Sequence, residues 1–130
     1  MMNSSKEANQ KYRERCKKIQ TFSPHIRYVG MINEFGRTIA GHLRKGVIPL
    51  FDTEEAINDH FIEAIRIRLR KALSPAVGDT LYTLTEHEKV IMITIPTKWG
   101  IYIVTLDKET GFTEIKDLID QILKQLPTIQ

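Results

Sequence analysis

Cysteine is almost absent from this sequence. Cys16 is the only one among 130 residues, so no disulfide can form within the chain. No apolar run approaches the ~20 residues that a membrane-spanning helix needs. The N-terminal residues also lack the basic start, apolar run and small-residue cleavage site of a secretory signal. These absences predict a domain of a reducing, cytoplasmic compartment, without a membrane span.

The motifs of nucleophilic, nucleotide and metal chemistry are missing as well. No glycine-rich stretch has the Walker spacing, and Ser23 and Ser74 each precede proline instead of standing in a nucleophile elbow. The candidate metal ligands show no Cys-x2-Cys or His-x3-His spacing; they are Cys16, His25, His42, His60 and His87. The sequence therefore predicts no enzyme, no cofactor and no metal.

Composition is that of one globular domain, with 42% hydrophobic and 27% charged residues. We expect a disordered tail over residues 1–5 and a single domain over residues 6–127. The net charge is +3, but it is unevenly distributed: residues 1–71 carry 14 basic and 8 acidic side chains, and the remainder carries 5 and 8. This polarity indicates where a charged partner would bind, without naming it.

Hydrophobic periodicity predicts three helices and five strands. Asp52 and Glu55 have the spacing of a capping box at the start of the middle helix. The apolar stripe of this helix consists of Ile57, Phe61, Ile62, Ile65, Leu69, Ala72 and Leu73. The carboxylates of its first turns, including Asp59 and Glu63, are expected on a solvated face. The predicted helices cover residues 6–22, 53–73 and 115–126, and the predicted strands cover 26–32, 37–45, 80–86, 89–96 and 101–106.

Strand composition predicts the order of the sheet. The first, fourth and fifth strands have apolar residues on both faces, which is typical of strands that are covered on both sides. The second and third strands carry interleaved polar residues, as expected at the edges. We therefore predict an α+β fold with the element order α-β-β-α-β-β-β-α, in which helices cover both faces of an antiparallel five-stranded sheet of order 2-1-5-4-3.

The element order and the segment from Ile26 to Gly41 resemble a known family. Its strand Ile26-Arg27-Tyr28-Val29-Gly30-Met31-Ile32, turn Asn33-Glu34-Phe35-Gly36 and strand of small residues resemble the opening hairpin of Roadblock-type, dynein light chain-like domains. In element order the resemblance extends from Tyr12 to Leu126. Profilins, longin domains and PAS-type sensors are related α/β sandwiches.

The Roadblock resemblance implies a non-enzymatic module that forms homodimers or heterodimers. Such modules pair through the central helix and the neighbouring edge strand, and serve as platforms for small GTPases, motors or signalling complexes. The matching segments here are Thr53–Leu73 and Thr80–Glu86. Apolar residues on this helix occupy more than one narrow stripe, which leaves Ile67 off the main face. The predicted dimer or partner interface consists of Ile57, Phe61, Ile65, Ile67, Arg68, Tyr82 and Leu84.

Two further surfaces are candidates for contacts. Large exposed apolar patches often mark interfaces, so a connecting loop and a hairpin tip form a possible contact surface comprising Val47, Ile48, Phe51 and Trp99. The first helix has a basic face of Lys11, Arg13, Lys17 and Lys18, which is able to contact phosphates of nucleic acid or anionic lipid. No aromatic side chains are interleaved with it for base stacking, so a solvated helix face is the favoured interpretation.

Two hypotheses about function remain open at this point. The first is a Roadblock-like homodimeric scaffold or regulatory adaptor with a small GTPase or another protein as partner. The second is a PAS-like or profilin-like sensory domain that binds a small molecule. The dense Ile and Val content of the last two strands predicts tight packing and argues against the cavity that the second hypothesis needs. Binding of nucleic acid through the first helix is a minor alternative.

Overall fold

A computed structural model describes residues 2–129, with side chains described for residues 9–126. Met1, the first residue of the expected tail, lies outside the described residues, and the first helix begins at Met2, earlier than predicted. The elements in chain order are α1 (Met2–Gln20), β1 (Ile26–Ile32), β2 (Thr38–Leu43), α2 (Thr53–Lys71), α3 (Ser74–Val77), β3 (Thr83–Glu86), β4 (Val90–Pro96), β5 (Ile101–Asp107) and α4 (Phe112–Ile129).

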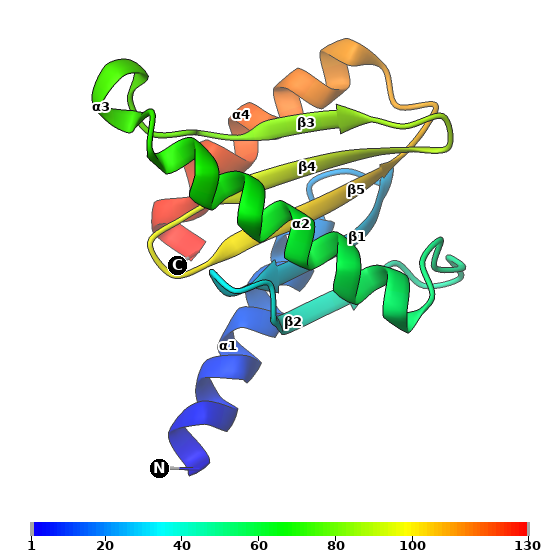
Figure 1. Cartoon of the computed structure of the whole chain (residues 1–130). Coiled ribbons are helices and arrows are strands. Elements are labelled where there is room, and N and C mark those ends of the chain that lie inside the picture. Colours follow the sequence, from blue (N-terminus) through cyan, green and yellow to red (C-terminus); the bar gives the residue numbers. More distant parts are fainter. Residues whose placement is uncertain (1, 130) are drawn as a thin grey trace.

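The five strands form one antiparallel sheet in the order β2-β1-β5-β4-β3 (Figure 1). This order confirms the prediction. The physical reason is visible along β4 and β5, where six of seven residues and five of seven residues are buried. Strands covered on both faces belong in the middle of a sheet, and the short, half-exposed β3 belongs at its edge.

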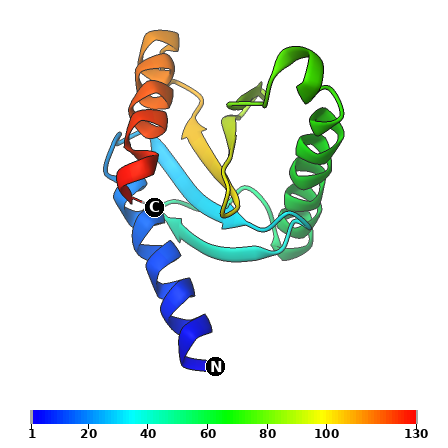
Figure 2. The ribbon, with the colours of Figure 1, turned by 90° about the vertical axis from the view of Figure 1, so that its left-hand side faces the viewer.

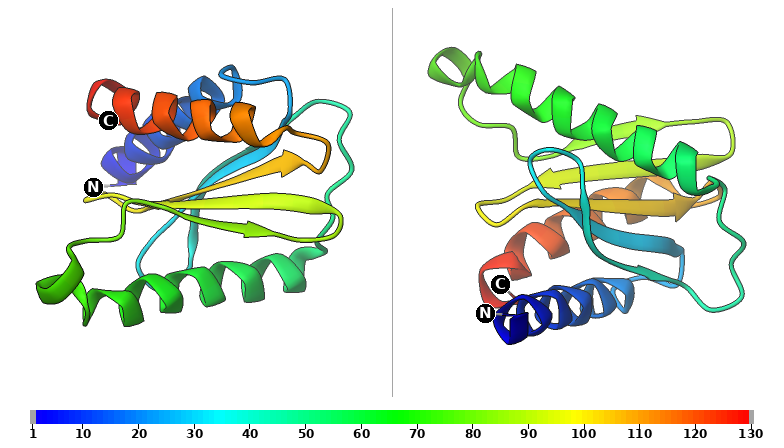
Figure 3. Two further views of the ribbon diagram at one scale, coloured as in Figure 1. Left: turned by 90° about the horizontal axis from the view of Figure 1, so that it is seen from above. Right: turned by 60° about the horizontal axis from the view of Figure 1, so that its bottom comes forward.

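Helices cover both faces, but unequally. The views in Figures 2 and 3 place α1 and α4 together on one face and α2 alone on the other. The main core lies between the sheet and α1 with α4, and includes Cys16, Ile19, Ile93, Tyr102 and Ile122. The core under α2 is much smaller. Among the described residues of this helix, Ala64 and Ile67 are the apolar side chains that belong to it.

Orientation of α2 differs from the prediction. The side chains that α2 buries are His60, Glu63, Ala64 and Ile67, spaced as one helical stripe. Ile67 is only 7% exposed, so it belongs to the core and not to the exposed surface. The row of Ile57, Phe61 and Leu69 is exposed, and Ile57 and Phe61 are among the residues predicted for the interface. Periodicity indicated the correct stripe width, but it could not tell which of two adjacent stripes faces the sheet.

Glu63 was expected on a solvated face, and this was also wrong. Its side chain is buried with 4% exposure, and one carboxylate oxygen, Oε2, has no hydrogen-bond partner among the described residues. The other oxygen accepts from Arg66 Nη1 at 3.3 Å. The inner stripe of α2 therefore contains two ionisable side chains, one alanine and one isoleucine, so it buries little apolar surface against the sheet.

The ends of α2 follow from its sequence. The predicted capping box is present: Asp52 Oδ1 accepts from the backbone N–H of Glu55 at 2.8 Å, and Glu55 Oε1 accepts from the N–H of Asp52 at 2.9 Å. Ser74-Pro75 ends α2 as expected but also starts the single helical turn α3, because proline fits the first position of a helix.

Candidate functional site

The hairpin turn between β1 and β2 holds α2 in place. Gly36 has φ of 87°, and a Cβ there would lie 2.8 Å from the Cα of Phe61, so glycine permits the turn to touch the helix backbone. Thr38 Oγ1 and His60 Nδ1 are joined by a hydrogen bond of 2.9 Å. These contacts fix the height of α2 above β2.

Arg68 adds a second anchor between α2 and the same turn. Its Nη2 donates to the carbonyl oxygen of Glu34 at 3.0 Å, and its guanidinium lies 5.4 Å from the ring centroid of Phe35. The cation over the aromatic face favours this position. Arg68, predicted as an interface residue, therefore docks α2 on its own chain.

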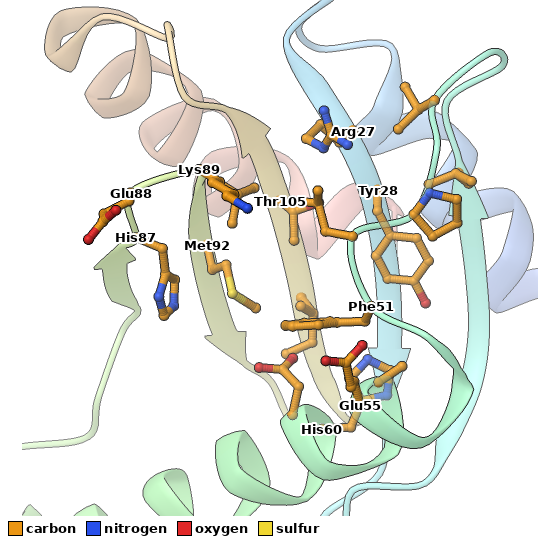
Figure 4. Close-up of a pocket in the computed structure, with 18 residues that line it drawn as sticks. Arg27, Tyr28, Phe51, Glu55, His60, His87, Glu88, Lys89, Met92 and Thr105 are labelled. Carbon is orange, nitrogen blue, oxygen red and sulfur yellow. The ribbon is translucent and has the colours of Figure 1, made fainter.

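A pocket of about 610 Å³ lies between the sheet, α2 and the loop after β2 (Figure 4). Its floor comes from the sheet with Tyr28, Met92 and Ile103, and the loop contributes Leu50 and Phe51. The volume falls in the range of small-molecule sites, about 300–1,000 Å³. The dense packing of the last two strands was expected to argue against a cavity; a pocket is nevertheless present, because the larger packed cluster is on the other face of the sheet.

Two paired glycines shape the floor of the pocket. Gly30 on β1 pairs with Gly41 on β2, and a Cβ on either one would come within 2.5 Å of the hydroxyl of Tyr28. The ring of Tyr28 therefore lies over a strip of bare backbone. Burial raises the pKa of Tyr28 to about 12, so its hydroxyl stays protonated at neutral pH.

An ion-paired cluster secures the loop at the open end of the pocket. Arg44 makes two bonds to Asp107, Nη1 to Oδ2 at 3.0 Å and Nη2 to Oδ1 at 3.3 Å, and Arg27 Nη1 reaches Oδ1 at 3.2 Å. Arg27 Nη2 also donates to the carbonyl oxygen of Ile48 at 3.0 Å. Burial alone would raise the pKa of Asp107, but hydrogen bonds from Arg44 and Arg27 outweigh it and lower that pKa.

Polar side chains at the α2 wall differ in charge state. Burial lowers the pKa of His60, which favours the neutral ring. Asp59 has its pKa raised from 3.8 to about 6, mainly by burial and then by the charge of Glu63, while His87 and Arg66 oppose the rise. Sequence reasoning missed Asp59 as a pocket residue. Its signal was the placement of Ala56, Asp59 and His60 on one side of the helix.

The structure separates the predicted interface residues into three groups. Ile57 and Phe61 lie on the outer face of α2, and Ile65 beside them is half-buried. Ile67 is in the core. Leu84 pairs with Ile93, and Tyr82 packs on the same core, so both belong to the face covered by α1 and α4.

The predicted contact surface is also divided. Val47 and Phe51 line the pocket, and the exposed Ile48 lies in the same loop. Trp99 is exposed in the β4–β5 turn, held by Thr97 at the opposite end of the sheet. The exposed apolar loop and Trp99 are therefore two separate features.

Side chains of the basic face lie as predicted on the exposed side of α1, namely Lys11, Arg13, Lys17 and Lys18. Arg15 is different: it is buried, with its guanidinium 5.1 Å from the ring centroid of Tyr12. Cys16 is fully buried next to it, and burial raises the pKa of its thiol to about 12, which disfavours the reactive thiolate.

The described residues offer neither a cluster of metal ligands nor a helix able to span a membrane. Among residues with described side chains, no group of three or more His, Cys, Asp or Glu is placed to hold a metal ion. Over the part of the chain that the structure describes, each helix is too short or too polar to cross a bilayer.

Comparison with known proteins assigns the fold. No family model and no curated protein matches the sequence. The gliding protein MglB of Thermus thermophilus superposes with a TM-score of 0.70 at 13% identity, over 92% of this chain and 88% of that one. A Roadblock/LC7 domain of Streptomyces avermitilis superposes with a TM-score of 0.59 at 12% identity, over 88% and 97%. The chain has the Roadblock/LC7 fold.

A further structure with this Roadblock/LC7 fold is described as MglB with a tetrameric arrangement. It superposes with a TM-score of 0.68 at 13% identity, over 89% of this chain and 85% of that one. This chain shares its fold with MglB, and the pocket and the outer face of α2 are described here for this chain alone.

Proposed function

We propose that this chain is a non-enzymatic scaffold or regulatory adaptor of the Roadblock type, which forms a homodimer through the outer face of α2. The observation that carries the proposal is the inverted amphipathicity of α2. Ile57 is 61% exposed and Leu69 is 68% exposed, while the buried stripe holds His60 and Glu63. A helix with its apolar side chains in solvent is stabilised when a second surface covers them.

A second copy of the chain is the occupant that the fold neighbours favour. One MglB structure with the same fold is described as having a tetrameric arrangement. Two α2 helices related by a twofold axis would bury Ile57, Phe61, Ile62 and Leu69 against their equivalents. The edge strand β3 has one open side, which is able to pair with a second chain and extend the contact.

The dimer is tested by sedimentation velocity at tens of micromolar. We expect wild type to sediment as a dimer and Phe61→Asp as a monomer, because the substitution places a charge in the centre of the contact. Phe112→Asp is the matched control: Phe112 is 81% exposed at the start of α4, on the other face of the molecule. A strictly monomeric wild type contradicts the proposal.

The proposed partner is a small GTPase or another protein of a signalling complex in the cytoplasm, as the Roadblock resemblance implies. The test is a tagged pull-down from the native cell followed by mass spectrometry, with wild type, Phe61→Asp and Phe112→Asp as baits. We expect a GTPase with wild type and Phe112→Asp, and its loss with Phe61→Asp if the dimer forms the platform. Equal recovery of the GTPase by all three baits would place its binding surface away from α2.

A further inference from the structure

The pocket under α2 has the features of a binding site for a small molecule, which a scaffold does not require. It is lined by the sheet floor, the N-terminal half of α2, the loop with Phe51, and the β3–β4 turn with His87. Figure 4 shows Phe51 reaching from the loop into the space between Tyr28 and Met92. Aromatic and thioether side chains around a flat floor suit a flat apolar body.

Two charged groups around the pocket, Glu55 and Arg27, already have partners in the chain. Glu55 caps α2 through the N–H of Asp52. Arg27 is held by Asp107 and by the carbonyl oxygen of Ile48. These groups shape the walls and have little capacity left for a ligand.

Among the other charged side chains that line the pocket, Glu88 and Lys89 are exposed in the β3–β4 turn, whereas Asp59 is half-buried. It lines the pocket, and in the described part of the chain its carboxylate has neither a hydrogen bond nor an ion pair. The neighbouring cation Arg66 is bonded to Glu63 instead. His87 faces Asp59 from the β3–β4 turn, and Lys89 is exposed at the rim. A carboxylate half-buried beside another carboxylate gains most from a cation that enters the pocket.

We propose that this pocket binds a small organic cation, with an apolar or aromatic body on the floor formed by Tyr28, Met92 and Ile103 and a protonated amine on Asp59. Charge complementarity selects this class over an organic acid, because the available group on the inner wall is a carboxylate. The site is separate from the outer face of α2, so the binding proposal does not depend on the proposed dimer.

A pair of probes with the same ring tests the charge preference. Tryptamine carries a protonated amine and 3-indolepropionate carries a carboxylate at a similar distance from the indole. Each is titrated into the full chain while the methyl signals of Met92 and Val90 are followed by NMR. We expect tryptamine to shift both signals in a saturable way and 3-indolepropionate to bind at least about tenfold more weakly.

Variants identify the group that binds the amine. Asp59→Asn keeps the shape of the side chain and is expected to weaken tryptamine binding by about tenfold. Glu54→Gln is the matched control, since Glu54 lies in the same helix outside the pocket and its loss of charge should leave binding unchanged. Ala56→Trp, which fills the pocket from α2, should abolish binding of both probes.

Three results would overturn the proposal. The first is equal or tighter binding of 3-indolepropionate, which would assign the pocket to acids through Lys89. The second is unchanged tryptamine affinity in Asp59→Asn. The third is the absence of saturable shifts with either probe. That result would mean that a partner protein's side chain or water occupies the pocket.

Discussion

At the scale of single residues, Asp59 links the pocket to stability. Its pKa is raised from 3.8 to about 6, first by burial and then by Glu63, with His87 and Arg66 opposing the rise. Between about pH 6 and pH 4 the folded chain holds a proton at Asp59 that the unfolded chain has released. The free energy of unfolding that this group contributes therefore falls as pH rises through that window.

Asp59→Asn should consequently stabilise the protein at alkaline pH. We expect a gain of about 1 kcal/mol at pH 8, smaller than the full pKa shift implies because the side chain is partly exposed. At pH 4 the gain should vanish, since the folded wild type is then neutral at this position. Urea denaturation at both pH values measures it, with the exposed Asp117→Asn on α4 as control. A loss of stability at pH 8 would show that Asp59 has a favourable partner.

Gly36 and Gly46 form a matched pair that separates backbone strain from contact. Both have positive φ, 87° and 84°, but a Cβ on Gly36 would meet the α2 backbone whereas one on Gly46 would meet nothing within 4 Å. Gly46→Ala should cost about 1 kcal/mol for its conformation alone. Gly36→Ala should cost about 2 kcal/mol more, measured by thermal denaturation. Equal costs would mean that the turn does not hold α2.

At the scale of elements, strand order was predictable and helix orientation was not. Each strand of the sheet carries its own evidence of burial, as Val90–Pro96 does by being apolar on both faces. The sequence of α2 has apolar residues on two adjacent stripes, and the choice between them depends on Gly36 and Arg68, which anchor the helix to the β1–β2 turn. Periodicity within the helix contains no information about those anchors.

The pocket was missed for a related reason. Dense packing in β4 and β5 was correctly inferred, but the larger of its two clusters is on the face under α1 and α4. On the other face the distance between α2 and the sheet is set by the hairpin turn and by the polar stripe with His60 and Glu63. A cavity arises from such spacing between layers, which strand composition alone does not reveal.

Orientation of α2 can be tested by paired truncations in the Phe61→Asp background, where the proposed dimer contact is removed. Ile67→Ala should lower the free energy of unfolding by about 3 kcal/mol, because it empties buried volume. Leu69→Ala should cost less than about 0.5 kcal/mol, since its side chain is exposed. Urea denaturation gives both values. The reverse ranking would mean that the adjacent stripe of α2 faces the sheet and that Leu69 is in the core.

At the scale of the whole molecule, the two faces of the sheet differ in how much apolar surface they bury. The face under α1 and α4 holds a deep core, whereas the α2 face has a small core, an open pocket and an apolar outer surface. Charge follows another axis, since the basic side chains are concentrated in α1 and at the end of α2. The basic end of α2 adjoins its apolar outer face, so an acidic partner would meet both at once.

A dimer that covers the α2 face makes stability depend on concentration. Unfolding of a dimer releases two chains. Each tenfold rise in protein concentration therefore stabilises the folded dimer by about 1.4 kcal/mol relative to the unfolded chains. For a chain of this size we expect each tenfold rise to increase Tm by a few degrees. Phe61→Asp should show a Tm that is independent of concentration, while Phe112→Asp should follow wild type. A wild-type Tm that stays constant from one to one hundred micromolar, within roughly a degree, would show that α2 completes its packing without a second copy.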